Sequence, residues 1–166
     1  MTSLAEIGSR TLKNIATLEA NFQRRARQWL EEMIQTGIRP LVYCGLRTME
    51  EQAALYAIGR SKAGKIVTKA RPGESYHNYG LALDWVAMKQ APGTDLYEAD
   101  WDDETAFKLG ERVGVTFGLN AISWETGHLQ DNRYASWRDI PAARVETPTV
   151  QLKTPTTGRS VRLRKP

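Results

Sequence analysis

Cysteine and histidine are scarce in this chain of 166 residues. Cys44 is the one cysteine, so the chain can form neither an internal disulfide nor a cysteine-rich zinc site. The two histidines are His77 and His128, and any imidazole chemistry therefore depends on them.

Long apolar runs are also missing. No stretch approaches the roughly 18 apolar residues that span a bilayer. The first residues, Met1 to Glu6, lack the basic region and apolar run of a secretory signal. We therefore expect the protein to accumulate in the cytoplasm unless another route exports it.

Positive charge is unevenly distributed, although the formal net charge is +4. Residues 151–166 carry five of the 23 basic residues and no acid, which leaves 18 basic against 19 acidic residues elsewhere, a net of −1. A basic face for nucleic acid is therefore not expected. The length and this composition predict one domain over 1–145 and a basic, extended or disordered tail over 146–166.

Apolar periodicity and capping patterns predict a mixed set of elements. The predicted helices are 9–36, 48–59 and one from Asp102 past Val113, and the predicted strands are 38–44, 81–88, 128–130 and a short one at 65–68. Residues 91–101 are predicted to be a loop. Because helices and strands do not alternate regularly, we expect an α+β domain with a small antiparallel sheet packed with helices.

Asp84 interrupts the apolar run Leu81-Ala82-Leu83-Asp84-Trp85-Val86. In a strand it shares a face with Ala82 and Val86, and a carboxylate buried there requires a partner or a metal ion. The alternative is an aspartate that faces solvent from an edge strand. Small Ala82 beside Asp84 would leave room for another group to approach.

Two histidines and one carboxylate suit zinc, because three protein ligands leave a fourth position open for water. Glu125 precedes His128 by three residues and could border the same cleft as a general base. The alternatives are structural histidines and a solvated surface glutamate.

The pattern Ser-x-His-x-x-Gly-x-Ala-x-Asp at 75–84, followed by Glu125-x-x-His128, resembles the M15 family of zinc peptidases. The segment 45–52 is similar to that family's Gly-Tyr-Arg-Ser/Thr-x-x-Glu-Gln element. The resemblance covers roughly residues 15–130. The sequence departs from the family at Gly127, where a proline or bulky residue is common, and at 118–124, where many members carry Trp-Gly-Gly.

The resemblance implies a zinc site in a cleft on the sheet and a role for each matching residue. By this carry-over His77, Asp84 and His128 bind Zn²⁺, Glu125 is the general base, Arg47 stabilises the oxyanion, and Ser75 and Gln52 bind substrate.

The segment 77–80 looks most like the phage endolysin branch. It implies a monomeric, antimicrobial L-alanyl-D-glutamate endopeptidase that cuts peptidoglycan stem peptides and lyses the host, kept in the host cytoplasm until its release to the wall. The alternatives are a D-Ala-D-Ala carboxypeptidase of wall remodelling and a non-catalytic, zinc-bearing wall-binding module. The basic tail either attracts anionic envelope lipid or only aids solubility.

Overall fold

The computed structural model describes residues 1–141, so the predicted tail and its boundary at 145 lie outside the described residues. The elements run in the order β1 (Thr2–Ser3), α1 (Leu4–Ile15), α2 (Ala20–Gln35), β2 (Pro40–Cys44), α3 (Met49–Ala57), the 3-10 helix η1 (Tyr76–Tyr79), β3 (Ala82–Gln90), β4 (Leu96–Asp100), α4 (Glu104–Thr116), β5 (Leu119–Ile122), β6 (Glu125–Asp131) and the 3-10 helix η2 (Trp137–Asp139). The predicted α+β class is confirmed. Within this range no helix is both long and apolar enough to cross a membrane.

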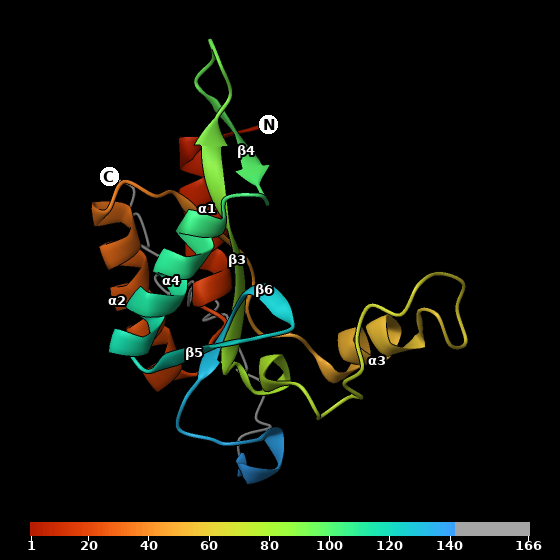
Figure 1. The fold of residues 1–166 in the computed structure, drawn as a ribbon. Coiled ribbons are helices and arrows are strands. Elements are labelled where there is room, and N and C mark those ends of the chain that lie inside the picture. Colours follow the sequence, from red (N-terminus) through yellow and green to blue (C-terminus); the bar gives the residue numbers. More distant parts are fainter. Residues whose placement is uncertain (142–166) are drawn as a thin grey trace, which may run out of the picture.

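The sheet is antiparallel and is built around β3. Its strands lie in the order β1-β4-β3-β6-β5, and β2 also pairs with β3. Helices α1, α2 and α4 lie together on one side of the sheet, whereas α3 and the loop after it project away from the body as an arm (Figure 1).

The core lies between β3 and this helical layer. Trp85 of β3 contacts Trp29 of α2 and Phe107 of α4, with ring centroids 5.2 and 5.1 Å apart. The Trp29 indole donates to the carbonyl of Gly110 in α4 at 2.9 Å. Because side chains alternate along a strand, Asp84 points away from this layer, to the face that carries the candidate site.

The predicted helix over 9–36 is two helices, with a break between Ile15 and Ala20. The backbone N–H of Leu46 donates to the Thr17 hydroxyl in this break, and that of Glu19 donates to the Gly80 carbonyl. The Glu19 carboxylate then caps α2. Tertiary contacts therefore set the break, because no glycine or proline marks it in the sequence.

One predicted strand and one predicted loop are wrong. Residues 65–68 form no strand, and the predicted loop 91–101 contains β4. Strand β4 pairs with β3, and its acidic Glu98 and Asp100 lie 3.8 and 3.5 Å from the Lys89 ammonium. The acidic residues of β4 are thus paired with a lysine of the neighbouring strand. Strand β5 was not predicted.

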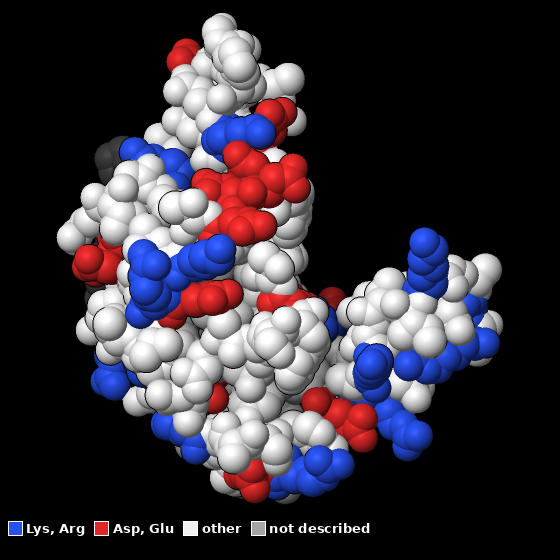
Figure 2. Space-filling model, viewed as in Figure 1, with Lys and Arg blue, Asp and Glu red and all other residues white. Residues whose placement is uncertain are grey.

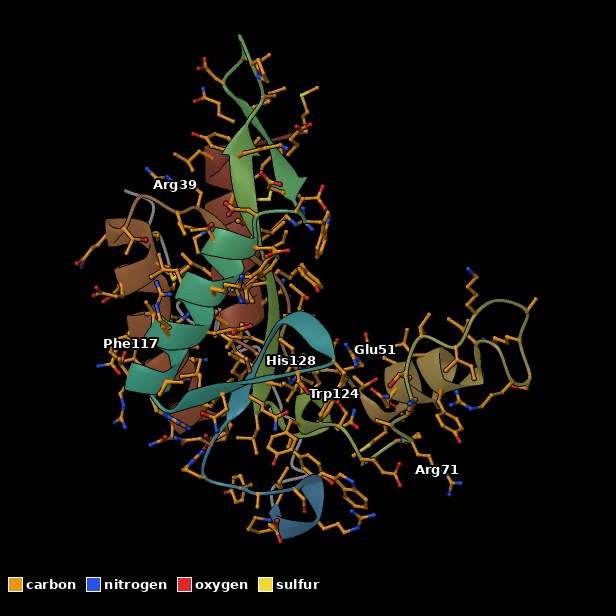
Figure 3. All side chains as sticks on the ribbon, viewed as in Figure 1. Arg39, Glu51, Arg71, Phe117, Trp124 and His128 are labelled. Atoms are coloured by element: carbon orange, nitrogen blue, oxygen red, sulfur yellow. The ribbon has the colours of Figure 1, made fainter. Side chains whose placement is uncertain are left out.

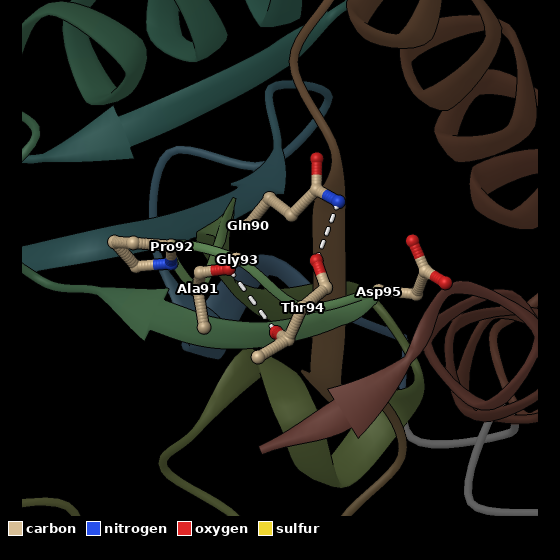
Figure 4. A pocket seen from close by; sticks show the side chains of 6 residues that line it. All are labelled: Gln90, Ala91, Pro92, Gly93, Thr94 and Asp95. Atoms are coloured by element: carbon tan, nitrogen blue, oxygen red, sulfur yellow. Dashed lines mark hydrogen bonds between the residues drawn. The ribbon is translucent and has the colours of Figure 1, made fainter.

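The turn between β3 and β4 encloses a small concavity at the end of β3 remote from Asp84 (Figure 4). The Gln90 amide donates to the Thr94 carbonyl at 2.7 Å, and the Thr94 hydroxyl donates to the Ala91 carbonyl at 3.1 Å. These bonds close the turn on itself, and the concavity is a consequence of the turn.

Candidate metal centre and active site

Three neighbouring strands place one side chain each at the candidate site. Cys44 of β2 is paired with Asp84 of β3, and Asp84 is paired with His128 of β6. The strand register therefore sets these three residues in a row across the sheet. His77 joins them from η1, the turn that precedes β3.

The turn that carries His77 depends on Gly80. Gly80 has φ +64°, and a Cβ atom there would lie 2.8 Å from the Glu19 nitrogen. Asn78 fixes the other side of the turn, because its carboxamide donates to the Arg47 carbonyl at 2.9 Å and accepts from Gly73 at 3.0 Å. Buried His77 is thus held in one place before any ligand binds.

Both imidazoles meet the same carboxylate oxygen. Asp84 Oδ1 lies 3.1 Å from His77 Nε2 and 3.0 Å from His128 Nδ1. All three side chains are at least 95% buried. A buried carboxylate with two converging imidazoles is the arrangement that the sequence suggested.

The outer nitrogen of each ring faces an oxygen acceptor. His77 Nδ1 lies 2.8 Å from the Gly45 carbonyl, and His128 Nε2 lies 3.1 Å from Gln130 Oε1. Only a protonated nitrogen can donate to these oxygens, so a neutral ring directs its inner lone pair at Asp84. Two lone pairs facing a carboxylate oxygen require either extra protons or a cation between them.

The pKa values of His77 and Asp84 are shifted in the directions that favour positive charge in the cluster. Burial lowers the pKa of His77, but the hydrogen bond and charge of Asp84 outweigh it and raise that pKa to about 10. Burial raises the pKa of Asp84, but the bonds to His128 and His77 outweigh it and hold that pKa well below its usual range. The cluster therefore favours bound positive charge.

The donor set fits zinc. Bond lengths of about 2.0–2.2 Å place neighbouring ligands of a tetrahedral zinc ion about 3.3 Å apart, close to the two distances at Asp84. The outer hydrogen bonds are those that fix the tautomer of a metal-binding histidine. Potential ligand atoms also lie within 4.8 Å of one another in two triplets that share Asp84, one with Cys44 and His77 and the other with Glu125 and His128.

Glu125 stands at the rim of this cluster. Its Oε2 lies 3.8 Å from His128 Nδ1, and its side chain is 49% exposed. It begins β6, directly after the exposed Trp124 (Figure 3). A carboxylate that is near the cluster but open to solvent can accept a proton from water without being one of the buried groups.

Arg47 faces the same aspartate from the other side. Its Nη2 lies 3.5 Å from Asp84 Oδ2, and its Nη1 donates to Gln52 Oε1 at 3.1 Å. The Gln52 amide in turn donates to the Ala70 carbonyl at 2.8 Å. Gln52 is fully buried, and both ends of its carboxamide are engaged by Arg47 and Ala70. Its predicted contact with substrate stays a prediction. Ser75 lies at the start of η1 with its side chain free of the helix cap, and its substrate role stays a prediction.

Three neighbours of the site were not predicted. Cys44 Sγ lies 3.7 Å from His77 Nδ1, and Tyr43 lines the same concavity as Cys44. Burial and the negative charges of Asp84 and Glu125 raise the pKa of Tyr43, so its hydroxyl stays protonated. Gln130 could have been found, because it lies two residues after His128 and therefore on the same face of a strand.

Gly127 explains one departure from the family pattern. It has φ +78°, and a Cβ atom there would lie 2.3 Å from the Trp85 carbonyl oxygen. Strand β6 therefore approaches β3 closely just before His128, and only glycine permits that approach.

Known proteins are similar in sequence and in fold. The peptidoglycan L-alanyl-D-glutamate endopeptidase CwlK of Bacillus subtilis (strain 168) is 47% identical over 66 residues, 40% of this chain and 39% of that protein. The L-alanyl-D-glutamate peptidase of Listeria phage A118 is 37% identical over 81 residues, 49% of this chain and 26% of that protein. The chain thus spans well under half the length of these two relatives.

A crystal structure of the Serratia marcescens L-Ala D-Glu endopeptidase ChiX matches with a TM-score of 0.51 and 23% identity, over 80% of this chain and 91% of that one. At this identity the match shows a common fold. The family model VanY, described as D-alanyl-D-alanine carboxypeptidase, matches residues 15–137, which contain every predicted site residue. The resemblance seen in the motifs is therefore confirmed, and the chain belongs to the VanY family.

Proposed function

We propose that this protein is a zinc metallopeptidase that hydrolyses the L-Ala–D-Glu bond of peptidoglycan stem peptides. The observation that carries the proposal is the convergence of His77, Asp84 and His128, with both outer imidazole nitrogens already facing acceptors. These three residues would hold the zinc ion. The names of the two sequence relatives support the choice of bond.

Each neighbouring group has a task in this reaction. Bound zinc supplies Lewis acidity for the carbonyl and for water. Glu125, exposed beside the cluster, takes a proton from the attacking water and passes it to the leaving amine. Arg47, held by Gln52, donates to the oxygen on which negative charge develops. The half-exposed position of Glu125 suits this exchange, because a proton carrier must reach both water and substrate.

The biological setting belongs to the same proposal. The phage relative supports the role of an endolysin that lyses its host, acting on the wall after release from the host cytoplasm. In this role the partner is peptidoglycan, the protein acts as a monomer, and the tail from 146 onward adds attraction to anionic envelope lipid. Deletion of 151–166 tests the tail: it should reduce lysis from outside and leave hydrolysis of purified wall unchanged.

A second candidate is a D-Ala-D-Ala carboxypeptidase, which the description of the family model favours. Digestion of purified peptidoglycan followed by mass spectrometry separates the two. New N-terminal D-glutamate supports the endopeptidase, whereas release of single D-alanine would replace it by the carboxypeptidase. No hydrolysis by the zinc-loaded protein would reject both and favour a wall-binding module.

A further inference from the structure

A cavity of about 550 Å³ opens beside the candidate site, between the body and the arm. Cys44 and Arg47 line the end next to the metal-binding cluster, and Ile58 and Lys62 line the far end. The hollow between the body and the projecting arm is visible in Figure 2, and Glu51 of its lining is labelled in Figure 3. The cavity is therefore continuous with the place where the reaction would occur.

Helix α3 sets the length of this cavity. Arg47 lies just before the helix and Lys62 lies just beyond it, and α3 has nine residues. At about 1.5 Å per residue the helix is about 14 Å long, the length of about four residues of extended peptide. A substrate that runs from the reacting carbonyl along α3 thus reaches Lys62 after about three to four residues.

The wall of the cavity is apolar and its far end is cationic. Leu46, Ala54 and Leu55 supply apolar contacts. Lys62 forms no ion pair with any residue among 1–141. The acid in the lining, Glu51, accepts from the Thr48 backbone at 2.8 Å as the cap of α3. The cavity thus offers a cation that has no counter-ion in the described part of the chain.

The backbone of Lys62 is fixed in position. Its N–H donates to the Ala57 carbonyl at 2.9 Å, and its carbonyl accepts from Gly59 at 2.8 Å. Gly59 has φ +76°, and a Cβ atom there would lie 2.7 Å from the Ile66 nitrogen, so this turn requires glycine. Lys62 is therefore set at the far end of the cavity by the turn that ends α3.

The surrounding charge has the same sign. Residues 58–73 contain five basic residues and no acid. Two of them hold the arm together: Arg60 stacks on the Tyr56 ring at 3.7 Å, and Arg71 bonds the Tyr56 hydroxyl at 3.4 Å. Lys62 is distinguished from the other lysines of this segment because it also lines the cavity.

We propose that Lys62 binds a carboxylate of the substrate about three residues from the bond that is cut. In a stem peptide cut between L-Ala and D-Glu the free carboxylates lie on the side of the leaving amine, so that side would run along α3. This inference rests on the proposed function and adds a specificity-determining residue to it. The free α-carboxylate of D-glutamate lies directly beside the cut bond, too near to reach Lys62. Two more distant carboxylates of a stem peptide remain: the free C-terminus, and the side chain of a diaminopimelate at the third position. A lysine at that position lacks the second.

The test uses four synthetic stem tetrapeptides, with diaminopimelate or lysine at the third position and a free or amidated C-terminus. Values of kcat/KM are measured for the zinc-loaded wild type, Lys62→Met and the matched control Lys65→Met, which removes a lysine of the same loop outside the cavity lining. The wild-type preference for one carboxylate should fall roughly tenfold in Lys62→Met and persist in Lys65→Met. The carboxylate whose preference falls is the one that Lys62 binds.

Unchanged preferences in Lys62→Met would overturn the inference, and so would an equal loss in Lys65→Met, because the effect would then be diffuse attraction. If the wild type cuts none of the four peptides, the proposed function fails, and calorimetric binding of the same peptides decides on Lys62. Equal affinities of wild type and Lys62→Met for the carboxylate peptides would then overturn it, and a selective loss would support it.

Discussion

Replacement of Gln130 by methionine should weaken zinc binding without unfolding the protein. Gln130 Oε1 lies 3.1 Å from Nε2 of the buried His128, and methionine of similar length removes this acceptor. An unsatisfied buried donor costs about 1–3 kcal/mol, and loss of a hydrogen bond to a metal-binding histidine lowers metal affinity by about 10–100-fold. The two magnitudes agree, because a tenfold change corresponds to about 1.4 kcal/mol.

Gln130→Glu provides the opposite perturbation at the same place. A carboxylate accepts from the imidazole more strongly than an amide does, so zinc affinity should be kept or increased. Competition with a chromogenic chelator measures affinity, and the melting temperature without zinc measures the fold. Gln90→Met, in the remote β3–β4 turn, is the control for a glutamine-to-methionine change. Wild-type affinity in Gln130→Met, or equal weakening by methionine and glutamate, would refute the reasoning.

Two further predictions concern stability. Gly127→Ala should lower the free energy of unfolding by about 3 kcal/mol, of which the positive φ accounts for about 1–2 and the contact with the Trp85 carbonyl for the rest. The control Gly93→Ala has φ +72° and nothing within 4 Å, so it should cost only the part due to φ. Equal losses for the two variants in urea unfolding would contradict this. Asp131 is fully buried, and although burial raises its pKa, bonds from Arg133 and the charge of Arg25 outweigh it and lower that pKa below the ordinary 3.8. The ionised Asp131 therefore stabilises the folded protein above about pH 4, and this stabilisation is lost as the pH falls through the folded-state pKa. Asp131→Asn should lower the free energy of unfolding by about 3 kcal/mol at pH 7 and by less at pH 3. A loss that does not depend on pH would show that the charge is not its origin.

The sequence predicted the elements whose signals are local. The capping box at Thr48 marked α3, and the apolar run with Asp84 marked β3. It could not predict the break between α1 and α2, because that break depends on Leu46 and Gly80, which are distant in the chain. Strand β4 was missed for a similar reason, since its acids are balanced by Lys89 only once the strands are paired.

Some features of the candidate site could likewise be predicted from the sequence, and others could not. Spacing and residue type made His77, Asp84 and His128 plausible ligands, and the family resemblance made the assignment firm. The structure brings the three side chains together. The burial of Gln52 against Ala70 could not be predicted, because it is a property of the folded arm and not of the motif. The contact between the Gly45 carbonyl and His77 could not be predicted, because any residue type can supply a backbone carbonyl as an acceptor.

The zinc content of two variants tests the central claim most directly. After equilibration with zinc and removal of excess metal, elemental analysis should find about one zinc per chain in the wild type and in Glu125→Ala, and none in His77→Ala. Hydrolysis of purified peptidoglycan should be lost in both variants. Zinc retained by His77→Ala, or full hydrolysis by Glu125→Ala, would contradict the assignment of the metal ligands or of the general base.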